Sequence, residues 1–119
     1  MSHNPVVALT IGDPGGIGPE ILVKALQKEK LSKRLAYLLI GSRQVFKTLC
    51  QKTGLWLPFK TVQDVSPGSL RGGNIYLLDV SGSLPGGGAF KIGKLCRENG
   101  QLAFAAIEQA ASLARSGIV

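Results

Sequence analysis

The sequence predicts an α/β fold in which helices cover both faces of a largely parallel sheet, a three-layer α/β/α arrangement. Two observations indicate this fold class. Short apolar runs rich in β-branched residues alternate with stretches whose apolar residues recur at helical spacing, and glycine or proline separates them. In addition, 45% of the residues are hydrophobic and 18% are charged, which is the balance of a globular domain. Strands that alternate with helices imply right-handed crossovers and parallel pairing.

The first strand is expected over residues 5–11, whose near-continuous apolar run suits a strand buried on both faces. A turn rich in glycine and proline follows at residues 12–19. From Glu20 the apolar positions recur at helical spacing, and Pro19 suits the first helical position, where its missing N–H costs nothing.

The same pattern then repeats. Residues 35–40 predict a second buried strand, and Ser42 is a suitable cap for a helix that runs to about Thr53 and stops at Gly54. Residues 59–62 predict a short strand and residues 75–80 a clearer one. The glycine-rich residues 64–74 between them predict a loop.

Residues 82–93 predict a second flexible stretch, and a long helix is expected from about Lys94 to Arg115. Gly100 inside this helix suggests close backbone packing, and Gly117 is a suitable stop. Ile118 and Val119 resemble the start of another strand, so we expect residues 1–119 to be the amino-terminal α/β segment of a longer protein, truncated near Val119. The apolar face of the helix is expected to contain Leu95, Leu102, Ala103, Ala106, Ile107, Ala110 and Leu113.

The formal net charge of +7 comes from 14 basic and 7 acidic residues, but the basic residues are dispersed and not interleaved with aromatic ones. We therefore expect no nucleic-acid partner. No apolar run approaches the ~20 residues of a membrane helix, and the start lacks the pattern of a secretory signal. The sequence thus predicts a cytoplasmic protein without a membrane partner, in which Cys50 and Cys96 are free, packed thiols.

The most informative segment is the turn over residues 12–20, Gly-Asp-Pro-Gly-Gly-Ile-Gly-Pro-Glu. Glycines permit positive φ and a close approach of a ligand or another backbone, and a helix start favours an anion. A purely structural turn would show the same glycines. Asp13 and Glu20 could act as a general acid/base pair, although capping of the turn and helix start is the more natural role for them.

Residues 10–20 resemble the amino-terminal signature of the 4-hydroxythreonine-4-phosphate dehydrogenase (PdxA) family of vitamin B6 biosynthesis. Residues 38–41 and 93–100 resemble later parts of the same family. Gly15 stands where the family commonly has alanine, which is a mild departure. Isocitrate and isopropylmalate dehydrogenases open with a shorter turn that lacks the equivalents of Pro14 and Gly15. A dehydrogenase of the isocitrate or isopropylmalate type is therefore the alternative hypothesis for the function. We expect the fold class of these enzymes in either case.

The resemblance implies a homodimeric oxidoreductase that uses NAD to oxidise a small phosphorylated hydroxy amino acid to a 3-oxo acid, which decarboxylates on the way to pyridoxal 5'-phosphate. It also implies a divalent metal, zinc, magnesium or cobalt, held by histidines. His3 is the only histidine of the chain, so no catalytic residue and no metal ligand is assigned here and the chain alone is expected to be inactive. The expected cofactor-binding residues are Gly12, Asp13, Gly16, Ile17 and Gly18.

Two other function classes stay open. Residues 88–95 nearly match a P-loop, Gly-x-x-x-x-Gly-Lys, but Leu95 replaces the serine or threonine that would bind magnesium, so chance resemblance is the simpler interpretation. The chain could also be a non-catalytic remnant that serves as a dimerisation fragment. A related phospho-sugar-acid dehydrogenase is a further alternative within the oxidoreductases.

Overall fold

Four strands form a single parallel sheet. The computed structural model describes residues 4–28 and 30–119. Within these residues the strands lie in the order β1-β2-β4-β3, with every neighbouring pair parallel. Their bounds are β1 (Val6–Thr10), β2 (Ala36–Gly41), β3 (Lys60–Val62) and β4 (Ile75–Asp79). The α/β fold and the parallel sheet that the sequence predicts are therefore confirmed.

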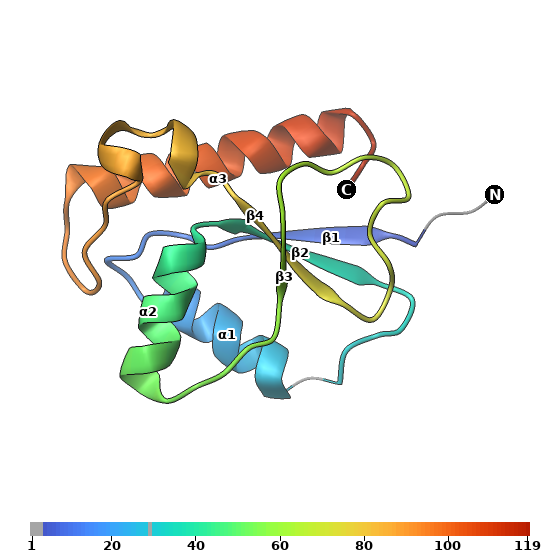
Figure 1. Cartoon of the computed structure of the whole chain (residues 1–119), viewed down its shortest axis with the longest axis horizontal. Coiled ribbons are helices and arrows are strands. Elements are labelled where there is room, and N and C mark those ends of the chain that lie inside the picture. The colour runs from blue at the N-terminus through green and yellow to red at the C-terminus, as the bar shows by residue number, and fades with distance from the viewer. Residues whose placement is uncertain (1–3, 29) are drawn as a thin grey trace.

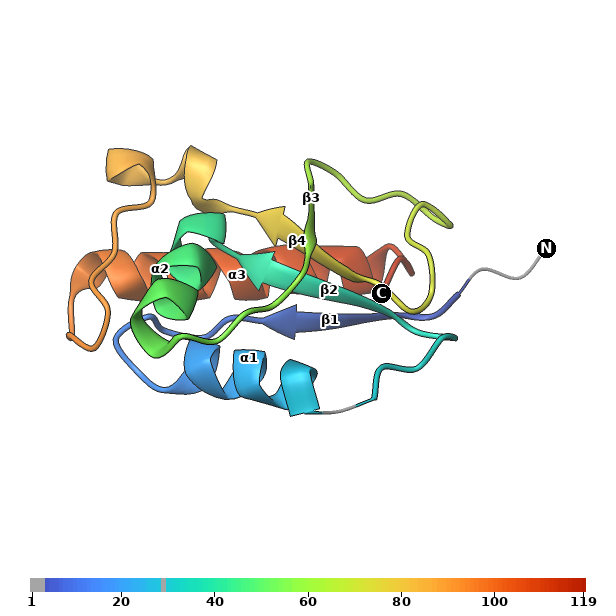
Figure 2. The ribbon, with the colours of Figure 1, turned by 60° about the horizontal axis from the view of Figure 1, so that its bottom comes forward.

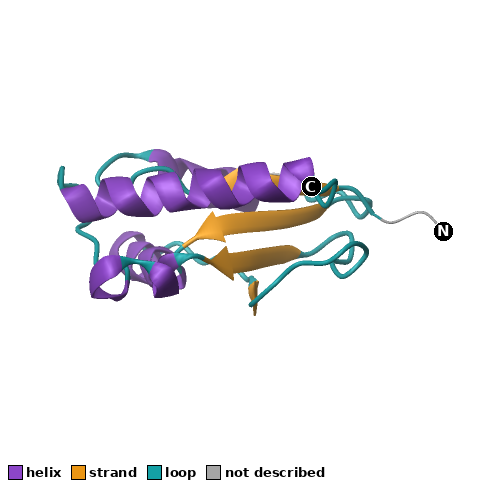
Figure 3. Cartoon of the chain, turned by 90° about the horizontal axis from the view of Figure 1, so that it is seen from above, coloured by secondary structure: helices purple, strands orange, loops and turns teal. Residues whose placement is uncertain are grey.

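The helices form layers on the two faces of this sheet, as Figures 1 and 3 show. Helices α1 (Gly18–Lys28) and α2 (Arg43–Thr53) lie side by side on one face, and α3 (Arg97–Arg115) lies across β1 and β2 on the other. Two 3-10 turns, η1 (Ser81–Ser83) and η2 (Pro85–Gly87), interrupt the connection from β4 to α3. No helix among the described residues is long and apolar enough to cross a membrane.

Each face of the central strands supplies one apolar cluster, because successive side chains of a strand point to opposite faces. Leu39 and Leu77 belong to the cluster of the α1–α2 face, whereas Leu38, Ile40 and Leu78 belong to that of the α3 face. All five side chains are buried. Helix α2 packs on the first cluster through Val45, Phe46 and Leu49. Ser42 is its N-cap, as predicted, and Ser42 Oγ accepts a hydrogen bond from the Val45 N–H.

The arrowheads of β1, β2 and β4 point to the same end of the sheet, and α1 and α2 begin at that end (Figure 2). The carboxyl edge of the sheet therefore collects the turn before α1, the start of α2 and the segment that leads into α3. In open parallel sheets this edge is where ligands bind.

The first strand is shorter and more exposed than predicted. It covers Val6–Thr10 rather than residues 5–11, and it lies at the edge of the described sheet. Val7 is 37% exposed, so the strand is not buried on both faces. The apolar run predicted burial on both faces wrongly, because β-branched residues are favourable in any strand and do not distinguish an edge strand from a central one.

The long helix also differs from the prediction. Helix α3 begins at Arg97, and Leu95 before it is 96% exposed rather than part of an inner face. Ile107 faces solvent too, at 56% exposure. Gly100 does not make the expected close backbone contact, since a Cβ added there would meet nothing within 4 Å. The other predicted inner residues, Leu102, Ala103, Ala106, Ala110 and Leu113, are buried or half-buried.

The segment after α3 forms no strand. Gly117 has φ of 73° and turns the chain, after which Ile118 and Val119 pack half-buried against the apolar cluster of the α3 face. The loop at residues 64–74 and the free state of Cys50 and Cys96 are as predicted. Burial raises the pKa of the half-buried Cys50 thiol.

Substitutions of Gly41 in β2 and Gly100 in α3 test the packing around these two glycines. A Cβ at Gly41 would overlap the buried side chain of Ile11, so we expect Gly41→Ala to lower the free energy of unfolding by about 1–3 kcal/mol. Gly100→Ala is the matched control in an open, helical position, where we expect a gain of about 0.5–1 kcal/mol. Urea unfolding of both variants measures these changes, and a Gly41→Ala protein as stable as the parent would contradict the packing described.

Candidate functional site

The glycine-rich turn connects the carboxyl end of β1 to the start of α1. The Ile11 N–H donates to the Ile40 carbonyl at 3.1 Å, which continues the pairing with β2 beyond the last residue of β1. Gly12 then adopts φ of 74°, a positive value of the kind that the glycines of this turn permit. The Ile21 N–H donates to the Ile17 carbonyl at 3.0 Å, so Ile17 occupies the N-cap position of α1 through its backbone.

Asp13 shapes the turn. Its Oδ1 accepts a hydrogen bond from the Gly15 N–H at 2.6 Å, and its carbonyl accepts one from the Gly16 N–H at 2.9 Å. Glu20 instead forms an ion pair with Lys24 along α1, at 3.2 Å. The structure therefore shows the capping role for Asp13, and the two carboxylates have separate partners.

The predicted cofactor residues lie together but differ in exposure. Gly12 and Asp13 are half-buried, whereas Gly16, Ile17 and Gly18 are exposed, with Ile17 at 70%. A Cβ at Gly18 would approach the Ile11 carbonyl oxygen to 3.2 Å. The exposed part of the turn is thus open to a ligand, while its inner part is fixed against β1.

A second glycine-rich segment packs against this turn from the far end of the chain. The Gly93 N–H donates to the Pro14 carbonyl at 3.1 Å, and a Cβ at Gly15 would overlap the Lys94 carbonyl. Residues 88–95 are the part that resembles a P-loop. They neither directly follow a strand nor directly begin a helix, because β4 ends at Asp79 and α3 begins at Arg97, so the P-loop geometry is not formed.

The Asn99 side chain, which sequence reasoning did not single out, holds that segment in place. Asn99 is fully buried at the start of α3. Its Oδ1 accepts from the Lys91 N–H at 2.9 Å, and its Nδ2 donates to the carbonyls of Lys91 at 2.7 Å and Lys94 at 2.8 Å. Because the same segment contacts Pro14 and Gly15, Asn99 fixes both loops of the edge. An Asn in the first turn of a helix, preceded by glycines, was the available signal.

Asp79 plays a similar part at the end of β4. Its Oδ2 accepts from the Arg43 N–H at 3.1 Å, at the start of α2, and its Oδ1 accepts from the N–H and hydroxyl of Ser81 at 2.8 and 2.6 Å. A carboxylate in this place favours the start of a helix electrostatically. It joins β4, α2 and η1 at the same carboxyl edge.

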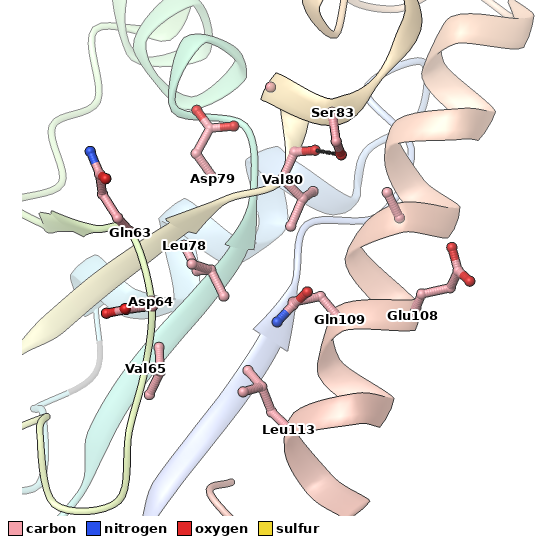
Figure 4. A pocket seen from close by; sticks show the side chains of 12 residues that line it. Gln63, Asp64, Val65, Leu78, Asp79, Val80, Ser83, Glu108, Gln109 and Leu113 are labelled. Carbon is pink, nitrogen blue, oxygen red and sulfur yellow. Dashed lines mark hydrogen bonds between the residues drawn. The ribbon is translucent and has the colours of Figure 1, made fainter. Parts of the chain in front are cut away.

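A cavity of about 460 Å³ lies beside Asp79, between β4, the loop after β3 and α3 (Figure 4). Asp64, Asp79 and Glu108 are its charged lining residues, and no basic side chain lines it. None of the predicted turn residues contributes to it, so the turn and this cavity are separate features. Across residues 4–28 and 30–119 no group of three or more His, Cys, Asp or Glu side chains could hold a metal ion, and His3 lies outside the described residues.

Comparisons with known proteins show relatives of this chain in sequence and in overall fold. The D-threonate 4-phosphate dehydrogenase of Cupriavidus necator is 33% identical over 111 residues, which is 93% of this chain and 32% of that protein. The solved structure of 4-hydroxythreonine-4-phosphate dehydrogenase from Burkholderia phymatum matches 99% of this chain and 35% of its own, with a TM-score of 0.78 and 28% identity. That of the Klebsiella pneumoniae enzyme matches 98% and 34%, with a TM-score of 0.77 and 27% identity.

No protein-family model matches the chain. The chain spans about a third of the length of the curated relatives it matches. It is therefore homologous, over nearly its whole length, to about one third of these dehydrogenases.

The contact of the glycine-rich turn with the segment at Gly93 and Lys94 can be tested by substituting two neighbouring glycines of the turn. Gly15→Ala introduces a methyl group that overlaps the Lys94 carbonyl, so we expect the free energy of unfolding to fall by about 1–3 kcal/mol. Gly16→Ala meets only the Asp13 carbonyl at an ordinary 3.6 Å and should change stability far less. Equal melting temperatures for the two variants would show that the loops do not touch at Gly15.

The role of Asn99 can be tested by a nearly isosteric change. Asn99→Asp keeps the acceptor for the Lys91 N–H but removes both donated hydrogen bonds, so we expect a loss of about 1–3 kcal/mol. Hydrogen exchange should also quicken at the Gly93 amide, whose partner is the Pro14 carbonyl. Gln101→Ala, half-buried on the same helix, is the control. Unchanged hydrogen exchange at the Gly93 amide in Asn99→Asp would contradict a clamp, that is, the role of the Asn99 side chain in holding residues 91–94 against the turn.

Proposed function

We propose that this chain is the amino-terminal α/β segment of a longer cytoplasmic, homodimeric, NAD-dependent dehydrogenase that oxidises a small phosphorylated hydroxy acid. One observation carries the proposal. The chain matches dehydrogenases of D-threonate 4-phosphate and of 4-hydroxythreonine-4-phosphate over almost all of its residues, in sequence and in fold. The segment would contribute one wall of the active site, and the remaining two thirds would supply the rest.

The substrate class follows from what these relatives are named for. D-threonate 4-phosphate and 4-hydroxythreonine-4-phosphate both carry a phosphate, a carboxylate and a secondary alcohol. The Cupriavidus necator relative is named for the first compound, and the two solved structures described above are named for the second. We assign the chain to this class, with D-threonate 4-phosphate as the first compound to test because the sequence match is to enzymes of that name.

The turn at residues 12–18 is the part of this chain that we assign to NAD. Gly16, Ile17 and Gly18 are exposed at the start of α1, where backbone N–H groups and the helix dipole favour an anion such as the pyrophosphate of a dinucleotide. Gly12 and Asp13 would support the turn from beneath, since Asp13 fixes the Gly15 and Gly16 amides. The clamp by Asn99 would keep this surface in one conformation.

The described residues do not fit the divalent metal that the family resemblance implies. No His, Cys, Asp or Glu cluster suited to a metal occurs within residues 4–28 and 30–119, and the three carboxylate residues beside the β4 cavity form no such group. If the full enzyme uses a metal, its ligands would come from outside this part of the chain. We assign no step of the reaction to a metal here.

The test is a chimera in which residues 1–119 replace the matching third of the Cupriavidus necator enzyme. We expect reduction of NAD, followed at 340 nm, with D-threonate 4-phosphate as substrate. Residues 1–119 alone should show no turnover, because they would lack most of the active site. A folded, dimeric chimera without activity on either phosphorylated substrate would refute the proposal.

A variant of the turn separates cofactor binding from folding. Ile17 is exposed, so Ile17→Asp should leave the chimera folded while placing a negative charge at the start of α1. We expect the KM for NAD to rise roughly tenfold with little change in kcat, because the carboxylate would repel the pyrophosphate. Ile17→Asn is the neutral control, and equal KM values for the two variants would argue against this location.

A further inference from the structure

On the α1–α2 face the chain carries an open apolar groove, and no residue of the glycine-rich turn lines it. The groove lies between α2 and the extended segment that joins α2 to β3. Its cavity has a volume of about 560 Å³ and is walled by Phe46, Trp56, Pro58 and Phe59, with Arg43 and Lys47 as its charged residues. We call this surface the Trp56 groove.

The backbone around Trp56 explains why its side chain points outward. Gly54, with φ of 71°, ends α2, and the Leu55 N–H donates to Thr53 Oγ1 at 3.3 Å. The following residues are extended, so alternate side chains point in opposite directions. Leu57 is buried and Leu55 half-buried, which leaves Trp56 between them 70% exposed. The side-chain amide of Gln27 on α1 donates to the Trp56 carbonyl and fixes the segment there.

The groove continues past Pro58 along the same segment. A cavity of about 370 Å³ shares Trp56, Leu57 and Pro58 with it, and reaches Leu26 and Leu31. A third cavity, of about 200 Å³, shares Pro58 and Phe59 and ends at Lys60. In Figure 1 this is the path of the connection from α2, past the end of α1, to β3. The apolar surface is therefore elongated and open.

The charges along this surface have one sign. Arg43, Lys47 and Lys60 line the three cavities, and no Asp or Glu of the described chain does so. The cavity beside β4 shows the opposite arrangement, since its charged residues Asp64, Asp79 and Glu108 are all acidic. The two surfaces therefore differ in the sign of their charged residues, and the positive groove is complementary to a partner with carboxylates.

We propose that the Trp56 groove docks an acidic segment of another protein, one in which carboxylates accompany apolar side chains. The apolar side chains would cover Trp56 and Pro58, and the carboxylates would face Arg43, Lys47 and Lys60. A single exposed tryptophan beside arginine is typical of the residues that dominate protein interfaces. Single-stranded nucleic acid fits less well, because it requires successive exposed aromatic faces and Phe46 and Phe59 are buried or half-buried. A second copy of this chain would bring a net charge of +7 to an already positive surface.

Trp56 is the only tryptophan of the chain, so its fluorescence reports directly on the groove. The probe is a blocked ten-residue peptide of alternating glutamate and leucine, titrated into the 119-residue chain. We expect a saturable blue shift of the emission and binding that weakens as NaCl rises from low to high concentration. The same peptide with glutamine for glutamate should bind much more weakly. Equal binding of both peptides would overturn the charge argument.

Matched variants locate the site. Arg43→Gln with Lys47→Gln should weaken binding of the acidic peptide about tenfold, as for charges at the rim of an interface. Arg71→Gln with Arg115→Gln removes the same amount of charge from exposed residues that line none of the three cavities and should bind as the parent does. Trp56→Ser should abolish binding measured by calorimetry. Equal loss in both double variants would mean a non-specific effect of net charge and would refute the groove.

Three further outcomes would overturn the proposal. The first is tighter binding of a single-stranded oligonucleotide than of the peptide. The second is an emission shift that arises from self-association and disappears on dilution. The third is loss of peptide binding in the dehydrogenase chimera, which would mean that the rest of the enzyme covers the groove.

The chimera also separates the two proposals. Trp56→Ser should leave its turnover unchanged, so a failure of the dehydrogenase activity and a failure of the docking surface are independent results.

Discussion

The three hydrogen bonds of the Asn99 amide are the interaction on which the carboxyl edge of the sheet depends. Residues 80–96 contain no regular structure beyond the two 3-10 turns and are rich in glycine, and several of their backbone N–H groups donate to other parts of the chain. A buried amide offers two donors and an acceptor in fixed positions, so it can replace the missing ladder hydrogen bonds of such a segment. The segment that Asn99 holds also contacts the turn before α1, because the Gly93 N–H donates to the Pro14 carbonyl and the Lys94 carbonyl lies against Gly15. Asn99 therefore also stabilises the start of α1 indirectly.

Carboxylates complete this edge in two further places. Asp13 fixes the turn before α1, and Asp79 fixes the start of α2 and the turn after β4. Both accept hydrogen bonds from backbone N–H groups near helix starts, where a negative charge is favourable. The edge is therefore built by short polar side chains that bind backbone groups, while the apolar clusters on the two faces hold the strands and helices beneath it. This division leaves the exposed glycines of the turn free to approach a ligand.

The elements could be predicted from the sequence because each has a strong local signal. The helix from Arg43 to Thr53 follows its serine cap and precedes its glycine stop, and the central strand is apolar throughout. Properties set by tertiary neighbours could not be predicted: the edge position of β1, the exposure of Ile107 and the open surroundings of Gly100. In the candidate site, the glycines predicted the turn, and the binding role of its residues stays a prediction. Asn99 was missed because its partners lie in a loop whose path no local pattern specifies.

The contact of Gly93 with Pro14 has a consequence for how the molecule assembles. It joins segments separated by most of the chain, so forming it carries the entropy cost of closing a long loop and requires that β2, β4 and α3 hold the two segments together. The surface around the turn is then present only in molecules that have completed their tertiary structure. A dinucleotide that binds there would bind the native state alone and would draw the folding equilibrium toward it, by RT ln(1 + [L]/Kd). Ligand concentration would in this way govern the lifetime of the polypeptide against proteolysis.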